Sequence, residues 1–278
     1  MTETPGNLED YSEDAEKRRI RRIAEEVLGL RFDEIQRSAS AANMVGIQSE
    51  NLLFSQRQDS RTYFVQDTRY GMDQAAGVFE GSDDELLERA RSILERLDIP
   101  RSEIGEELVL KEQVQVAQVD QYGTARMEEV QEGKKLARLS RQIDGLPVWS
   151  SNHILGLTKD AQIGFMQLHW PEILSHVVTE AHKLNYQVEQ GWRPPEQPGA
   201  TVEAVEAGII HSPAVGLLMD IYPVIRVIYT PVDRPGKKPT LYLDRDGHNV
   251  PIPRQFDLPP GAVIPTQPAR RQDYRQSS

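Results

Sequence analysis

The clearest hydrophobic pattern in the chain is a stripe that repeats every three to four residues between Ser82 and Pro100. Ser82 followed by Glu85 has the spacing of a capping box, which begins a helix. Pro100 disfavours helical backbone before it and ends the pattern. The sequence therefore predicts an amphipathic helix, whose buried face is formed by Leu86, Leu87, Ala90, Ile93, Leu94 and Leu97.

Two other segments have the same helical period. The first is predicted from about Ser12 to Leu28, and Gly29 follows where a helix would stop. The second follows Pro171, which we expect in its first turn because proline is tolerated there. The stripe of this second helix contains Ile173, Leu174, Val177, Val178, Ala181, Leu184 and Val188.

From Leu108 onward the apolar period changes from 3.6 to 2, and β-branched residues become frequent, as is typical of strands. Asp144-Gly145 is a tight hairpin signal between two such runs. The middle of the chain is thus predicted to be an antiparallel meander preceded by a helix. Other strands are expected at 62–65, once or twice between 32 and 59, at 154–157, 163–168 and 208–211, within 217–230, and at 240–243.

These elements predict an α+β fold in which a helix packs on a curled, cystatin-like antiparallel sheet, and the pattern is compatible with one or with two such units. The expected organisation is an N-terminal helix (1–30), a helix-plus-sheet domain (31–170), a second helix-plus-sheet unit (171–258) and a disordered proline-rich tail (259–278). Fourteen of the 18 prolines lie from Pro194 onward, which favours edge strands and open loops there.

Composition narrows the possible functions. With 38% hydrophobic residues in 278, the chain can bury a core. Its net charge of −11 disfavours nucleic acid as a partner. The absence of cysteine excludes disulfides and thiolate chemistry. No apolar run near the start resembles a membrane span or a secretory signal, so the expected location is the cytoplasm, with no membrane partner.

One stretch carries a family resemblance. Arg141-Gln-Ile-Asp-Gly-Leu-Pro-Val-Trp-Ser150, with Asn152-His-Ile-Leu-Gly-Leu-Thr-Lys-Asp160 after it, resembles the propeptide modules of thermolysin-type proteases (FTP) and the related PepSY domains. The resemblance covers roughly 105–170. It implies a cystatin-like layer of helix on sheet, and a protein that binds or inhibits a protease, or assists its folding, without being an enzyme itself.

Searches for catalytic motifs give little. The sequence has no G-x-S-x-G, G-x-x-x-x-G-K-[ST], G-x-G-x-x-G or H-E-x-x-H pattern, and no cofactor or metal is predicted. Asp244-Arg-Asp-Gly247 begins like a calcium loop. However, the twelfth position is Gln255 rather than Glu, and prolines interrupt the loop, so a turn is predicted instead.

The candidate binding residues surround the meander: Trp149, Ser151, His153, His169 and Trp170. Tryptophan combines a large apolar face with a hydrogen-bond donor, which is common at binding hot spots. His153 and His169 are also weak candidates for acid–base catalysis. The alternative is that the two tryptophans only fill space between helix and sheet. His176 and His182 are six residues apart, on different faces of a helix, and so are poor joint ligands.

Three functions remain open. The first is a non-catalytic protein that holds an extended polypeptide along a sheet edge. The second is a peptide-modifying enzyme, for example one that promotes cyclisation or rearrangement in natural-product biosynthesis, with His153 or His169 as acid or base. The third is a structural or assembly component that docks through its tail after Pro259. A homodimer or heterodimer through a sheet edge is compatible with all three.

Overall fold

The computed structural model describes residues 18, 20–32, 37–41, 44–57, 61–72, 77–114, 117–119, 125–127, 131–211, 221–233 and 238–250. The start of the predicted N-terminal helix and the predicted proline-rich tail lie outside these residues. The described chain forms one eleven-stranded sheet and a separate two-stranded ribbon.

The helical elements are η1 (Ile23–Val27), α2 (Arg69–Met72), α3 (Asp83–Arg96), η2 (Arg101–Glu103) and α4 (Ser175–Glu189). The strands of the N-terminal part are β1 (Arg37–Ala41), β2 (Met44–Gln48), β3 (Leu52–Arg57), β4 (Thr62–Asp67) and β5 (Ile104–Val114). The ribbon consists of β6 (Ala117–Val119) and β7 (Ala125–Met127). The remaining strands are β8 (Gln131–Ile143), β9 (Leu146–Leu157), β10 (Ile163–His169), β11 (Ala200–His211), β12 (Ile221–Pro231) and β13 (Thr240–Leu243). None of these helices is long and apolar enough to cross a membrane.

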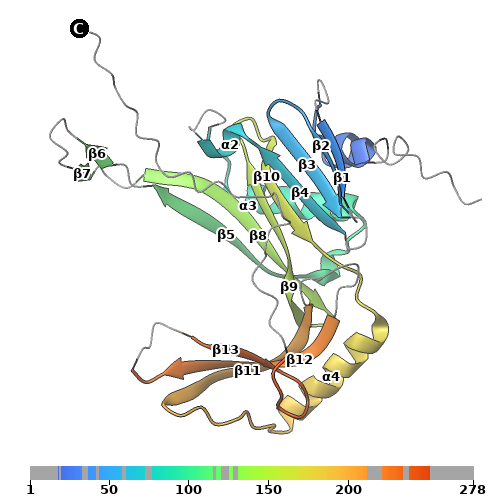
Figure 1. Cartoon of the computed structure of the whole chain (residues 1–278), viewed down its shortest axis with the longest axis vertical. Coiled ribbons are helices and arrows are strands. Elements are labelled where there is room, and N and C mark those ends of the chain that lie inside the picture. The colour runs from blue at the N-terminus through green and yellow to red at the C-terminus, as the bar shows by residue number, and fades with distance from the viewer. Residues whose placement is uncertain are drawn as a thin grey trace, which may run out of the picture.

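The large sheet is organised around β9 (Figure 1). Along its main path the order is β1-β2-β3-β4-β10-β9-β11-β12-β13, and β8 pairs with both β9 and β5 off this path. All of these pairings are antiparallel except that between β9 and β11, which is parallel. The sheet is therefore mixed. It has two branches that share β9: the first contains β1–β4, β10, β8 and β5, and the second contains β11, β12 and β13.

The strand β9 changes partner halfway along its length. Its second half, from Asn152, pairs with β10, whereas Val148 in its first half pairs with Ile209 of β11. On its other side β9 pairs with β8 throughout, but the register jumps between Asn152 and Val148. Residues 149–151 thus form a bulge, and β10 and β11 lie on the same side of β9, one on each side of that bulge.

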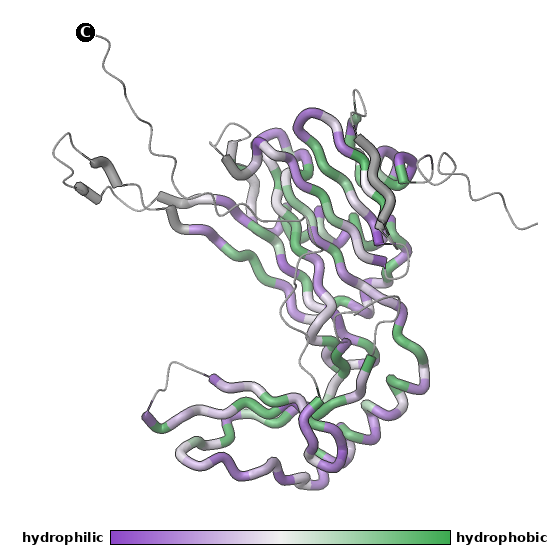
Figure 2. The backbone as a smooth tube through the Cα atoms, viewed as in Figure 1, coloured by the Kyte–Doolittle hydropathy of each residue, from purple (hydrophilic) through white to green (hydrophobic). Residues whose placement is uncertain are grey.

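Two helices cover the two branches. Helix α3 packs on the first branch, against β5, β8 and β9. The largest buried cluster lies there and includes Phe54, Leu94, Leu139 and Trp170. Helix α4 packs on β11 and β12 through Leu184 and other residues of two smaller clusters. Hydrophilic and hydrophobic positions alternate along many of the strands, as Figure 2 shows, because side chains of a strand point alternately to its two faces.

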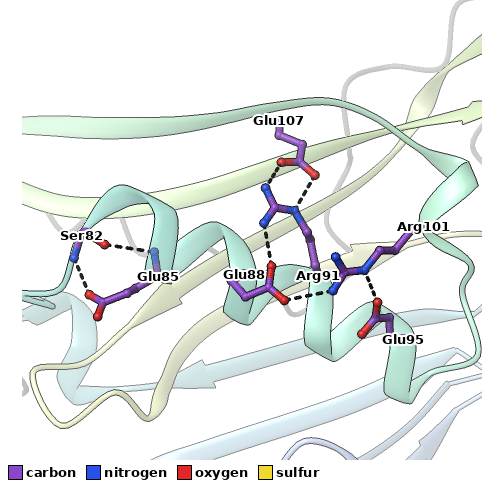
Figure 3. Close-up of polar contacts among 7 residues, drawn as sticks. All are labelled: Ser82, Glu85, Glu88, Arg91, Glu95, Arg101 and Glu107. Carbon is purple, nitrogen blue, oxygen red and sulfur yellow. Dashed lines mark hydrogen bonds and ion pairs between the residues drawn. The ribbon is translucent and has the colours of Figure 1, made fainter.

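Helix α3 confirms the predicted capping box. The Ser82 hydroxyl accepts a hydrogen bond from the Glu85 backbone N–H, and the Glu85 carboxylate accepts one from the Ser82 N–H (Figure 3). On the outer face of the helix, Arg91 binds Glu88 and also Glu107 of β5. The Arg91–Glu88 pair is exposed and adds little stability, whereas the Arg91–Glu107 pair is partly buried; burial of the apolar face is what mainly holds this helix in place.

The predicted fold class is wrong. The chain does not form a helix packed on a curled, cystatin-like antiparallel sheet, nor two such units: it forms mostly one large mixed sheet with only short helices. The physical reason is that a period of 2 identifies strands but does not specify their neighbours. Nothing in the pattern of β9 indicates that one strand pairs with β8, β10 and β11.

Two local predictions have opposite outcomes. The Asp144-Gly145 hairpin is confirmed, with φ of 50° and 81° at the two positions, as a tight hairpin turn requires. Pro171 was expected in the first turn of the second helix, which is wrong because α4 begins only at Ser175. The Pro171 carbonyl instead accepts a hydrogen bond from the buried Arg141 guanidinium.

Candidate functional site

A chain of hydrogen bonds crosses the junction of β4, β10, β11 and β9. Thr62 Oγ1 lies 2.6 Å from His169 Nδ1, and His169 Nε2 lies 3.2 Å from His211 Nδ1. His211 Nε2 is in turn 3.1 Å from Ser151 Oγ. Four residues from four strands are thereby linked in one line, and two of them, Ser151 and His169, belong to the predicted site.

The topology explains why the two histidines meet. His169 is the last residue of β10, which runs antiparallel to β9, and His211 is the last residue of β11, which runs parallel to it. Since both strands lie on the same side of β9, their C-terminal ends converge on the bulge. The bulge supplies Ser151, and also Ser150, whose hydroxyl accepts a hydrogen bond of 2.8 Å from the His211 backbone N–H.

The line of hydrogen bonds allows a limited set of proton positions. With both imidazoles neutral, every donor can point the same way, either from Thr62 towards Ser151 or in reverse. One extra proton is also compatible, because a charged His169 would donate to both of its neighbours. Two extra protons would place an N–H of His169 against an N–H of His211, so the pair holds at most one.

Burial and nearby positive charge disfavour that extra proton on His211. Only 2% of His211 is exposed, and its pKa is lowered to about 2, mainly by burial and further by His169 and the Arg141 guanidinium. Ser151 is 1% exposed. A substrate cannot reach its hydroxyl in this conformation, and a base of such low pKa accepts protons poorly. The four residues therefore form a buried hydrogen-bond network that links the strands, and Ser151 and His211 are not arranged as a nucleophile and its base.

Trp170 supports the junction from the other face of the sheet. Its indole Nε1 donates a hydrogen bond of 2.9 Å to the Glu103 carboxylate, which also binds Arg141. The Arg141 guanidinium lies 5.3 Å from the centre of the Trp170 ring. Because Trp170 is 1% exposed, it belongs to the core and does not form a contact surface.

His153 does not join the site. It is paired across the sheet with Leu139 and Leu168, both fully buried, so it points into the core that α3 covers, while Asn152 beside it faces the same way as His169. Neither ring nitrogen of His153 has a hydrogen-bond partner among the described residues, and burial lowers the pKa of His153 to about 3. A histidine so enclosed cannot exchange protons with a bound peptide.

Trp149 lies on the face of β11–β13 that is opposite to α4. Its ring centre is 4.6 Å from the Arg226 guanidinium and 5.7 Å from the ring centre of Tyr242. It also covers Gly208, where an added Cβ would lie 2.7 Å from the indole. Trp149 is half-buried, so part of it remains available for contact beside β11.

The structure thus brings together two of the five predicted residues, Ser151 and His169, with Trp149 nearby. His211 was not among the residues predicted for the site, and it lies 42 positions from His169 in the sequence. No local pattern signals this contact. His176 and His182 are exposed on α4, away from the junction.

The Asp244 segment forms the predicted turn. One oxygen of Asp244 accepts hydrogen bonds of 2.9 Å from the backbone N–H groups of Asp246 and His248. One side-chain atom from each of Asp244, Asp246 and His248, of the kind that can bind a metal ion, lies within 4.8 Å of the other two. The turn geometry accounts for this proximity.

No model of a known protein family matches the sequence, and no curated protein matches it. Among solved structures the chain is similar to an uncharacterized protein from Eubacterium rectale, at 14% identity and a TM-score of 0.45, over 87% of this chain and 83% of that chain.

Proposed function

We propose that this protein binds an extended segment of another polypeptide, which adds as a further strand to the open edge of β11. The observation that carries the proposal is the pairing of β11. On one side it pairs with β12 along its whole length, from Ala200 to His211. On its other side, within the described residues, only Ile209 has a strand partner.

An open edge of this kind can hold a peptide. Unpaired backbone N–H and C=O groups offer hydrogen bonds to any extended chain, and neighbouring side chains select its sequence. The open stretch of β11 runs from Ala200 to about Glu206, a length of roughly 20 Å for a strand that rises about 3.3 Å per residue. We therefore expect a bound segment of six or seven residues.

Two other edges of the sheet, those of β13 and β5, suit a peptide less well. The outer side of β13 is approached by its own following residues, with a bridge between Leu243 and Asn249. The edge strand β5 carries the exposed charges Glu106, Lys111 and Glu112. Charged side chains on an edge strand oppose pairing with another chain. On β11 each of the two acidic residues pairs with a basic side chain, Glu206 with Arg226 and Glu203 with Lys238, and Trp149 lies alongside.

The proposed setting is the cytoplasm, on the ground that the chain contains no cysteine for the disulfides common in exported proteins. The proposal keeps the idea of polypeptide binding that the sequence suggested, but not a cystatin-like fold. It assigns no catalytic role to His153 or His169, because both are buried in the arrangement described above.

The test uses the whole protein and a library of random twelve-residue peptides displayed on phage. Selected peptides would be synthesised, and amide hydrogen exchange measured with and without them. We expect slower exchange at Ala200–Glu206. If peptides bind without protecting these amides, or if none is enriched, the proposal is wrong.

A matched pair of variants at Glu203 sharpens the test. Glu203 is the bulge residue of β11, skipped in the register with β12 between Val202 and Ala204, and proline is tolerated at bulges. Glu203→Pro removes one N–H and obstructs the edge, whereas Glu203→Ala removes the same carboxylate and leaves the backbone intact. Binding should weaken at least about tenfold with proline and stay within about twofold with alanine.

A further inference from the structure

The open edge of β11 ends a row of charged and aromatic side chains. Tyr242 of β13, Arg226 of β12 and Glu206 of β11 are direct cross-strand neighbours and so share one face of the sheet. Arg226 is held between Trp149, whose ring it covers, and the Glu206 carboxylate. Its position is therefore fixed from both sides, and Glu206 is the last member of the row.

Glu206 is only partly satisfied by Arg226. Both Arg226 Nε, at 3.1 Å, and Arg226 Nη2 bind the same oxygen, Oε2 of Glu206. The other oxygen has no hydrogen bond to a described residue, and 45% of the side chain is exposed. Glu203, by contrast, uses one oxygen for Lys238 and the other for Thr230. One carboxylate oxygen at the edge thus remains for a partner.

We infer that the polypeptide strand bound at β11 carries a lysine or arginine opposite Glu206; this inference rests on the proposed function. A residue of the added strand opposite Glu206 would lie on the same face, with its Cβ about 5 Å away. A basic residue there continues the alternation of charge begun by Arg226. Its own charge would lie near the free oxygen of Glu206, where a carboxylate would be repelled.

The face of β11 that packs against α4 indicates which residue types should flank that basic residue in the bound strand. Val205 and Ala207, on either side of Glu206 in β11, point towards α4 and pack on the cluster around Leu184. Residues on each side of the basic position in the bound strand would extend this apolar face. We therefore expect apolar, preferably β-branched residues to flank the lysine or arginine.

A second copy of this chain is a poorer occupant of the edge. β11 carries two acidic residues, Glu203 and Glu206, and no lysine or arginine. Two copies paired through this strand would bring four carboxylates to one seam, and like charges across a strand pair are destabilising.

The experiment compares peptides selected from the same phage library on the wild-type protein and on Glu206→Gln and Glu206→Lys. Wild-type selections should show lysine or arginine at one position with apolar neighbours. Replacing that residue by glutamate should weaken binding at least about threefold, and more so at low salt. Glu206→Gln should remove the difference, and Glu206→Lys should reverse it. Glu203→Gln serves as the control and should leave it intact.

The outcomes separate the two claims. Peptides that protect the β11 amides but show no charge preference that depends on Glu206 would overturn this inference and leave the proposed function standing. Failure to protect these amides with any peptide would overturn both. Protection of the edge that grows with protein concentration and without peptide, together with a dimer in analytical ultracentrifugation, would also overturn the inference in favour of a second copy.

Discussion

His169 Nε2 lies 3.2 Å from His211 Nδ1, and this contact joins the end of β10 to the end of β11. Both rings are buried, and each uses its second nitrogen to bind a hydroxyl group, of Thr62 or of Ser151. These side-chain hydrogen bonds therefore connect the two branches of the sheet at the bulge in β9, where the regular backbone pairing of the strands is interrupted.

Removing one histidine of this pair should destabilise the fold. In His211→Ala, His169 Nε2 and Ser151 Oγ lose the contacts of 3.2 and 3.1 Å that they make with the His211 ring, and the loss of a hydrogen bond by a buried polar group costs about 1–3 kcal/mol. We expect urea unfolding at about pH 7.5 to show a loss of about 2–4 kcal/mol. The same change at the exposed His182 should cost less than about 0.5 kcal/mol. Equal effects of the two substitutions would contradict this reading of the junction.

Stability should fall on mild acidification. Burial lowers the pKa of His153 to about 3 and that of His211 to about 2 from 6.5, so below pH 6.5 the unfolded chain binds more protons than the folded one. The free energy of unfolding is therefore not reduced by these two histidines above pH 6.5. It decreases as the pH falls from 6.5 towards their pKa values in the folded protein. We expect a decrease of about 4 kcal/mol in the free energy of unfolding between about pH 7.5 and pH 5. Free energies that do not change over this range would show that neither histidine is held neutral.

Replacing His153 by leucine should remove about half of that pH dependence. The imidazole lies between Leu139 and Leu168 and has no hydrogen-bond partner in the described part of the chain, so an apolar side chain of similar size suits the position better. At about pH 7.5 we expect His153→Leu to stabilise the protein by about 1–3 kcal/mol. His176→Leu, on the exposed face of α4, is the control. A destabilised His153→Leu would indicate a role for the ring that its surroundings do not reveal.

A methyl group at Gly208 should disturb the contact between β9 and β11. The added Cβ would lie 2.5 Å from the Pro147 carbonyl oxygen and 2.7 Å from the Trp149 ring, and the backbone oxygen cannot move away easily. We expect Gly208→Ala to cost about 1–3 kcal/mol and to alter tryptophan fluorescence. Gly105→Ala is the matched control, since its nearest neighbour would be the Ser140 hydroxyl at 3.0 Å, which can rotate. The prediction fails if Gly208→Ala unfolds at the wild-type urea concentration.

Much of the local structure could be read from the sequence. The capping box at Ser82, the helix it begins and the Asp144-Gly145 hairpin depend on neighbouring residues, and all three are present. The strands expected at 62–65 and 163–168 are present too. These features follow from side-chain period and turn chemistry, which act over a few residues.

The candidate site could be predicted only in part from the sequence. Ser151 and His169 could be chosen as polar residues near the meander, but His153 and Trp170 turned out to face the core. His153 directly follows Asn152 in β9, and in a strand that single step reverses the face. Without the register, the sequence could not assign either side chain to a surface or to the interior.

By itself, the amino-acid sequence determined which segments become helices or strands, because hydrophobic period and capping depend on residues close along the chain. Only the tertiary structure decided that β9 pairs with three strands, that His169 meets His211 and that, among the described residues, only Ile209 of β11 has a strand partner on the side facing β9. These relationships connect residues tens of positions apart. They depend on how a whole sheet buries its apolar faces at once, which no short stretch of sequence specifies.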